Sequence, residues 1–168
     1  MWALLVAIPL VVAVKAYDDA REWWQSSELI ERPVMAGTRA QLGGAEWRLA
    51  DIRLAAERPD GSAVALVQLE AVVGEGGMTT RLPCKLVLRD AQGRQWLPTF
   101  LPAAVRSPDG KRITTTSCNT VILSKPQPGA QFTVTESFIL PRAAFDDVTP
   151  TLSVAAERPM YLRFLRKR

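Results

Sequence analysis

The sequence predicts an all-β domain, an antiparallel β-sandwich, preceded by an N-terminal α-helix. After residue 37 there are about seven short stretches rich in β-branched and aromatic residues, with turn signals about every ten residues. No window in that region shows helical spacing over a helix-length run. The first 32 residues differ, because a continuous apolar run is followed there by residues that favour helix. The 168 residues suffice for one domain and an appendage.

The apolar run covers residues 2–14 and ends at Lys15. As a helix it is about 20 Å long, shorter than the roughly 30 Å hydrocarbon core of a bilayer. Three interpretations are open: a signal-peptide segment cleaved near Ala16, a short membrane anchor whose helix continues to residue 31, or a buried core helix. We favour the anchor, whose predicted lipid contacts are Trp2, Leu4, Leu5, Ile8, Leu10 and Val14.

The flanks of this run bear on its orientation. Trp23 and Trp24 follow it, either as interfacial aromatic residues or as a contact between helix and sandwich. Lys15, Arg21 and Arg32 also follow it, and the positive-inside rule taken alone would place the domain in the cytoplasm. We nevertheless expect a single-pass cell-membrane protein with its domain on the extracytoplasmic side, because the predicted fold and the two cysteines indicate export.

The remaining elements follow in order along the chain. The helical stretch should end at residue 32, because Pro33 disfavours helix at the residue before it. Trp47 and Trp96 are expected in the core. These elements divide the chain into an anchor and stalk (1–32), the sandwich (37–160) and a basic tail (161–168). Strands are expected at 47–54, 63–73, 84–89, 95–100, 113–116, 121–124, 131–140 and 151–155, with a short one at 161–165.

Two segments resemble a known group of proteins. The hairpin 86–96 and the later segment 123–141 resemble bacterial exported domains with a telokin-like immunoglobulin fold, many of them from actinobacteria. The resemblance covers about residues 37–155 and implies an immunoglobulin-like sandwich and an exported or membrane-anchored location, with no catalytic residues. The lipoprotein variant of the group has a cysteine near its start that this chain lacks. The matching positions are Asp90, Gly93, Trp96, Pro128, Gly129, Phe138 and Pro141.

The net charge of +4 comes from the end of the chain. Without the last four basic residues, 17 basic and 17 acidic residues balance, so no basic face for nucleic acid is expected. The tail is either a solvated terminus or a contact for anionic lipid headgroups. Its basic residues are Arg163, Arg166, Lys167 and Arg168.

The residue inventory argues against catalysis. The chain contains no histidine, which excludes Ser-His-Asp and Cys-His catalysis and any zinc site that needs imidazole. Adjacent carboxylates at Asp18-Asp19 and Asp146-Asp147 do not form a metal site, so we expect no metal and no cofactor. Cys84 and Cys118 are read first as a disulfide of an oxidising compartment, and otherwise as two buried thiols.

These observations predict a membrane-anchored, non-catalytic module of the cell envelope that docks on another envelope protein or membrane complex. The expected partner surface is the apolar stretch Phe100, Leu101 and Pro102. The alternative is a carrier that binds a lipid-like or other small ligand, which requires a cavity in the sandwich.

Overall fold

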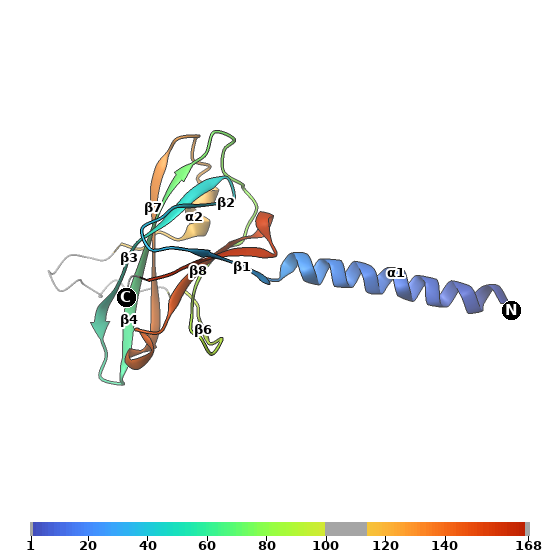
Figure 1. Cartoon of the computed structure of the whole chain (residues 1–168), viewed down its shortest axis with the longest axis horizontal. Helices are drawn as coiled ribbons and strands as arrows, with labels where there is room; N and C mark the ends of the chain where they lie inside the picture. The colour runs from blue at the N-terminus through green and yellow to red at the C-terminus, as the bar shows by residue number, and fades with distance from the viewer. Residues whose placement is uncertain (1, 100–113, 167–168) are drawn as a thin grey trace.

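The computed structural model describes residues 2–99 and 114–166, with side chains for all of these except residues 2–10 and 25. Two β-sheets pack face to face, and a long helix, α1, extends away from them (Figure 1). Phe100, Leu101 and Pro102 therefore lie outside the described residues, as do Lys167 and Arg168. The β-sandwich architecture predicted from the sequence is confirmed.

One sheet has five strands in the order β1-β9-β8-β5-β6, and the other has four in the order β2-β3-β4-β7. All neighbours are antiparallel except β1 and β9, which run parallel. The first sheet consists of β1 (Ile30–Val34), β5 (Cys84–Arg89), β6 (Gln95–Trp96), β8 (Thr149–Val154) and β9 (Met160–Phe164). The second consists of β2 (Ala40–Leu42), β3 (Ala45–Glu57), β4 (Ser62–Val73) and β7 (Gln131–Pro141).

The helix α1 spans Trp2–Ser26, and all its described side chains from residue 11 to residue 24 are exposed. The interpretation as a buried core helix is therefore wrong. Trp23 and Trp24 are 60% and 48% exposed, so neither is buried against the sandwich. Within the described residues, no helix is both long enough and apolar enough to cross a membrane.

Both ends of the sandwich differ from the sequence-based expectation. The helix was expected to continue to residue 32, but it ends at Ser26, and residues 30–34 form β1. Pro33 lies in this edge strand, where its missing N–H breaks no ladder hydrogen bond on the open side. The short strand expected at 161–165 is present as β9, so the stretch expected to begin the basic tail belongs mostly to the sandwich, whose last strand ends at Phe164.

The irregular alternation in residues 47–54 has a structural cause. Register shifts interrupt the pairing of β3 with β4 between Leu49 and Asp51 and again between Leu54 and Ala56. Each bulge inserts one residue and reverses which face the following side chains occupy. Trp47 and Leu49 therefore share the core side with Ile52 and Leu54, although a strict period of two would separate the two pairs.

The core fills the space between the two sheets. Trp47 is fully buried, as predicted, whereas Trp96 is half-buried and only packs against the edge of the core. A smaller cluster lies on the other face of β4 and consists of Ala55, Val64 and Leu66, with Ala56 and Ile139 packed against it. The largest fully buried side chains of the core are Trp47, Leu69, Leu86, Leu88, Ile122, Phe138, Leu140, Leu152, Leu162 and Phe164.

The region between β5 and β7 differs most from the prediction. The β5–β6 hairpin forms as expected, with Asp90 Oδ1 accepting the N–H groups of Gln92 and Arg94, but β6 has only two residues. Of the strand expected at 113–116, the structure describes only an isolated bridge from Thr116 to Thr135. The stretch expected as strand at 121–124 belongs mostly to a short helix, α2 (Cys118–Leu123).

Three-residue 3₁₀ turns follow β7 and β8, at Arg142–Ala144 and Ala155–Glu157.

Candidate functional site

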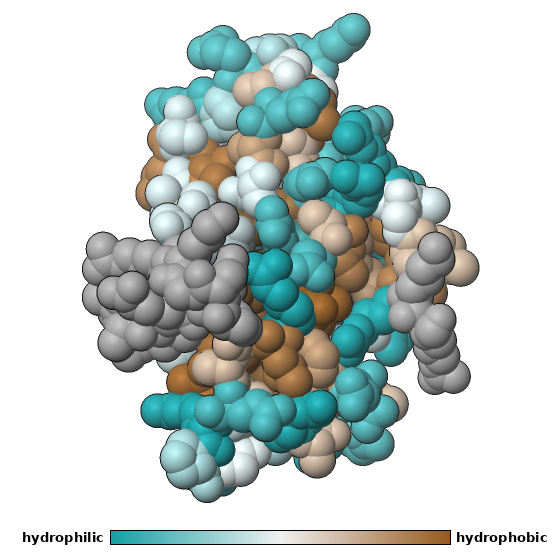
Figure 2. Space-filling model, turned by 90° about the vertical axis from the view of Figure 1, so that its left-hand side faces the viewer, coloured by the Kyte–Doolittle hydropathy of each residue, from teal (hydrophilic) through white to brown (hydrophobic). Residues whose placement is uncertain are grey.

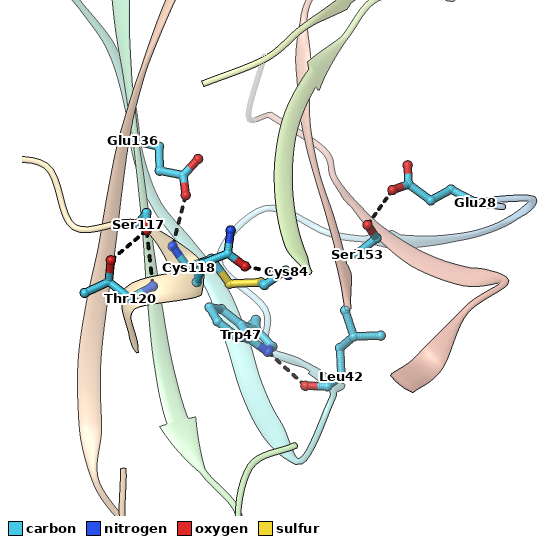
Figure 3. Close-up of a disulfide and its surroundings, with 10 residues drawn as sticks. Glu28, Leu42, Trp47, Cys84, Ser117, Cys118, Thr120, Glu136 and Ser153 are labelled. Carbon is cyan, nitrogen blue, oxygen red and sulfur yellow. Dashed lines mark hydrogen bonds between the residues drawn. A yellow bond between two sulfur atoms is a disulfide. The ribbon is translucent and has the colours of Figure 1, made fainter. Parts of the chain in front are cut away.

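A disulfide between Cys84 and Cys118 fixes α2 to the sandwich, and it confirms the predicted pairing. Cys84 begins β5 and Cys118 begins α2, and both residues are buried. A second link runs beside the first, because the backbone N–H of Cys84 donates to the side-chain oxygen of Asn119 at 2.9 Å. Ser117 caps the helix by accepting the N–H of Thr120 (Figure 3). Together these contacts hold α2 in one position.

Glu136 is the only buried glutamate among the described residues, and it lies in the middle of β7 at 6% exposure. One carboxylate oxygen, Oε1, accepts the backbone N–H of Cys118 at 3.0 Å (Figure 3). The other oxygen, Oε2, is buried and has no hydrogen-bond partner in the described part of the chain. Buried carboxylate oxygens normally have partners, so an unpaired one at such a site requires an explanation.

Glu136 borders a cavity of about 340 Å³, which we call the Glu136 cavity. The cavity lies where β7 meets the segment after β6 and the segment that leads into α2. Its lining is rich in hydroxyl groups, and no lysine or arginine of the described chain lines it. Besides Glu136 and Pro98, the lining consists of Thr99, Thr115, Ser117, Thr120, Thr135 and Ser137.

The pairing of β7 explains how residues from both of its faces reach one cavity. β7 is the last strand of its sheet, and its outer edge is contacted at two points. Thr116 exchanges backbone hydrogen bonds with Thr135, and the N–H of Thr99 donates to the carbonyl of Ser137. Glu136 lies between these two contacts, so the cavity wraps around the edge of the strand.

Burial raises the pKa of Glu136 above its ordinary value of 4.5, and the hydrogen bond from Cys118 offsets only part of this effect. A buried carboxylate without a counter-charge costs several kcal/mol of desolvation. The folded protein therefore holds a proton on Glu136 more tightly than the unfolded chain does.

Glu136→Gln is expected to stabilise the protein increasingly as the pH rises above 4.5. The native glutamate has a higher pKa when folded, so its contribution to stability is full below the unfolded pKa and is lost as the pH rises through the folded pKa. Glutamine does not titrate and keeps the neutral shape. Urea unfolding of both proteins across this pH range measures the difference in unfolding free energy.

The control for this comparison is Glu75→Gln, which removes an exposed carboxylate in the turn after β4. Effects of net charge on stability should be shared by the two variants, so only the difference between them reports the buried site. A stability difference between Glu136→Gln and the native chain that stays constant with pH would contradict the assignment.

A second feature with functional potential is the junction between α1 and the sandwich. The N–H groups of Leu29 and Ile30 both donate to the carbonyl of Pro159, and Ile30 pairs with Met160. The large apolar side chains here are partly exposed: Leu29 by 40%, Ile30 by 45% and Met160 by 41%. We call these three residues the junction cluster; two of them, Leu29 and Ile30, follow closely after Trp23 and Trp24 in the sequence.

Glu28 fixes the connection between α1 and β1. Its carboxylate pairs with Arg89 of β5, accepts the hydroxyl of Ser153 of β8, and lies 3.8 Å from Arg158. Arg158 also donates to the carbonyl of Ser26, the last residue of α1. These polar contacts tie the segment after the helix to β5, to β8 and to the connection before β9, so the junction is a defined structural connection.

The other predicted site residues are scattered in the fold. Arg163 belongs to β9 and pairs with Glu31, and Arg166 donates to the carbonyl of Phe145 and lies over its ring. The predicted anchor residues Trp2, Leu4, Leu5, Ile8, Leu10 and Val14 all lie in α1.

Neither Glu136 nor Glu28 was predicted from the sequence as a site residue. For Glu136 a signal exists: it alternates with Val134 and Phe138 on the apolar side of a strand, and a lone carboxylate in such a row indicates a buried charge. For Glu28 no signal exists, because its partners Arg89, Ser153 and Arg158 are distant in sequence. Ser117 could have been read as a helix N-cap, but only six helical residues follow it.

No family model matches the sequence, and no curated protein matches it. Two solved structures are similar in shape. One is an uncharacterised β-sandwich protein from Clostridium difficile 630, with a TM-score of 0.46 and 10% identity, covering 84% of this chain and 97% of that chain. The other is a conserved hypothetical protein from Bacillus anthracis, with a TM-score of 0.43 and 10% identity, covering 76% of this chain and 93% of that chain.

Proposed function

We propose that this protein is a non-catalytic module held at the extracytoplasmic face of a cell membrane by α1, from where the sandwich docks on another envelope protein. The observation that carries the proposal is the exposure of α1. Val11, Val12 and Val14 are each about 60% exposed or more, and none is buried by the sandwich. Exposure of these apolar side chains to water is unfavourable in free energy, and insertion into lipid removes this unfavourable exposure.

The distribution of residues along α1 suits insertion of its first half. Residues 2–14 are apolar, and Lys15 can extend its ammonium group to the headgroups while its stem stays in an apolar environment. Trp23 and Trp24 come two turns further along, where aromatic side chains are favourable at the level of the headgroups.

The junction cluster supports the same placement. Leu29, Ile30 and Met160 add exposed apolar surface at the point where the sandwich meets the helix. Because Glu28 ties α1 to the sandwich, a membrane that holds the helix also holds this end of the domain close to the bilayer. The opposite side then faces away from the lipid. Figure 2 views that side and shows hydrophobic side chains around a central polar group, and we propose this face as the docking surface.

Two further considerations favour the extracytoplasmic side. A disulfide between buried cysteines persists in an oxidising compartment and is rare in the cytoplasm. The Asp90–Gly93 hairpin turn follows β5 and the Pro128-Gly129 turn directly precedes β7, and both carry the resemblance to telokin-like immunoglobulin domains of exported bacterial proteins. We therefore propose that the sandwich is immunoglobulin-like.

Flotation of the full chain with neutral phosphatidylcholine vesicles tests the role of α1. The native chain is expected to float with the vesicles, and Val11→Lys/Val14→Lys to remain in the dense fraction. Each lysine in the apolar region costs about 2.5–3.5 kcal/mol, so the partition coefficient should fall about a thousandfold or more.

The matched control is Ala16→Lys/Ala20→Lys, which adds the same two charges to exposed positions in the polar half of the same helix. This variant should float like the native chain. Equal flotation of both variants, or no flotation of the native chain, would refute membrane attachment through α1. Both pairs lie outside the sandwich, so a folding defect is not expected to confuse the result.

A further inference from the structure

We propose that the Glu136 cavity binds a small molecule that carries a primary ammonium group. The carboxylate of Glu136 and the surrounding hydroxyl oxygens accept the hydrogen bonds that this group donates. The inference goes beyond membrane attachment and does not depend on it, because the cavity is built from β7 and the segments beside it. It rests on the buried, unpaired Oε2 of Glu136 and on the hydrogen-bonding character of the lining.

The lining presents acceptors more than donors. The hydroxyl of Ser137 gives its proton to the carbonyl of Thr99, so its oxygen has only lone pairs left for a ligand. Ser117 and Thr120 lie 2.9 Å apart through their hydroxyl oxygens, so one of their two protons is used between them (Figure 3). Glu136 Oε2 adds a further acceptor. An ammonium group, which carries three donors and no acceptor, complements such a set.

The carboxylate of Glu136, which has no positive side chain of the described residues beside it in the cavity, also favours a cationic ligand. No lysine or arginine of the described residues lines the cavity, and the one hydrogen bond to Glu136 comes from an uncharged backbone N–H. A buried carboxylate is strongly destabilised unless an opposite charge or several donors lie beside it. A bound ammonium group supplies both, through charge-assisted hydrogen bonds that are about twice as strong as neutral ones.

The dimensions and the rigidity of the cavity also suit a small ligand. Its volume of about 340 Å³ lies at the lower end of the range for small-molecule sites. The disulfide and the hydrogen bond from Cys84 to Asn119 hold α2, so Ser117 and Thr120 are already in place before a ligand arrives. Binding to a preformed site avoids the cost of ordering its side chains.

The test compares two probes that differ in one group, 1-amino-1-deoxysorbitol and sorbitol. The full chain in non-ionic detergent micelles is titrated with each, and amide NMR shifts report both the affinity and the location. The amino compound is expected to shift the amides of Thr135, Glu136 and Cys118 and to bind roughly tenfold to a hundredfold more tightly than sorbitol, because only it can form charge-assisted hydrogen bonds.

Two variants complete the test. Glu136→Gln keeps the side-chain shape and should lose the preference for the amino compound, whereas Glu75→Gln removes one exposed carboxylate and should keep it. Equal binding of the two probes, an unchanged preference in Glu136→Gln, or no shift around Glu136 at any concentration would each overturn the proposal. None of these results bears on flotation, so the two proposals fail separately.

Discussion

Trp47→Ala is expected to lower the free energy of unfolding by about 4–5 kcal/mol, the largest loss for any single substitution described here. The indole is fully buried between the two sheets. Its Nε1–H donates to the carbonyl of Leu42 at 2.9 Å, and its ring meets that of Phe132 edge to face, with centroids 5.5 Å apart. Alanine would leave a large cavity and a carbonyl without its donor, and each of these is costly.

Urea unfolding followed by far-ultraviolet circular dichroism measures this loss without relying on tryptophan fluorescence. Trp96→Ala is the matched control, because it removes the same side chain from a half-buried position on the short strand β6. That variant should lose only about 1 kcal/mol, as is usual away from the core. Similar losses for the two variants would contradict the central position assigned to Trp47.

Cys84→Ala/Cys118→Ala is expected to lower the free energy of unfolding by about 3–4 kcal/mol. The two cysteines are 34 residues apart in the sequence. In the entropic model, the disulfide stabilises the fold because closing a loop of this length lowers the conformational entropy of the unfolded chain. Both side chains are buried, so small cavities add to the loss. The amides of segment 114–117 and of α2 should lose the most protection from hydrogen exchange, because the disulfide holds them to β5.

Chemical unfolding with and without reductant provides the measurement and its control. Reductant should destabilise the native chain by a similar amount and leave the double variant unchanged. The redox state in living cells is read by acid quenching followed by alkylation under denaturing conditions, because both sulfur atoms are buried. Recovery of two free thiols would contradict the disulfide and, with it, the extracytoplasmic placement of the domain.

The parts of the fold that the sequence predicted well have signals in neighbouring residues. β4 is a long valine-rich run and β7 alternates cleanly, so burial can be read directly from the pattern. β1 could not be found in this way, because residues 30–34 contain a proline and two charged residues and form a strand only through parallel pairing with β9. The helix α2 was missed because six residues are too few to show helical periodicity.

The candidate site was less predictable than the fold, because it depends on contacts between residues that are distant in the sequence. The disulfide could be predicted from the count of two cysteines. The Glu136 cavity combines residues from three segments separated by up to about forty positions, and their proximity depends on the pairing of β7 with Thr99 and Thr116. Residue pattern reports which face a side chain occupies, but it does not report which distant loops meet at the edge of a strand.

The parallel pairing of β1 with β9 has a mechanical consequence. Figure 1 shows β1 continuing away from α1 in roughly the direction of the helix axis, so a force that pulls on α1 acts along the strand. All the hydrogen bonds between residues 30–34 and 160–164 would then bear the load together in shear, where peeling would break them one at a time. A domain tethered in this way resists extraction through its last strand, and a force on the tether passes through β1, at the edge of the five-stranded sheet, into the neighbouring strand β9.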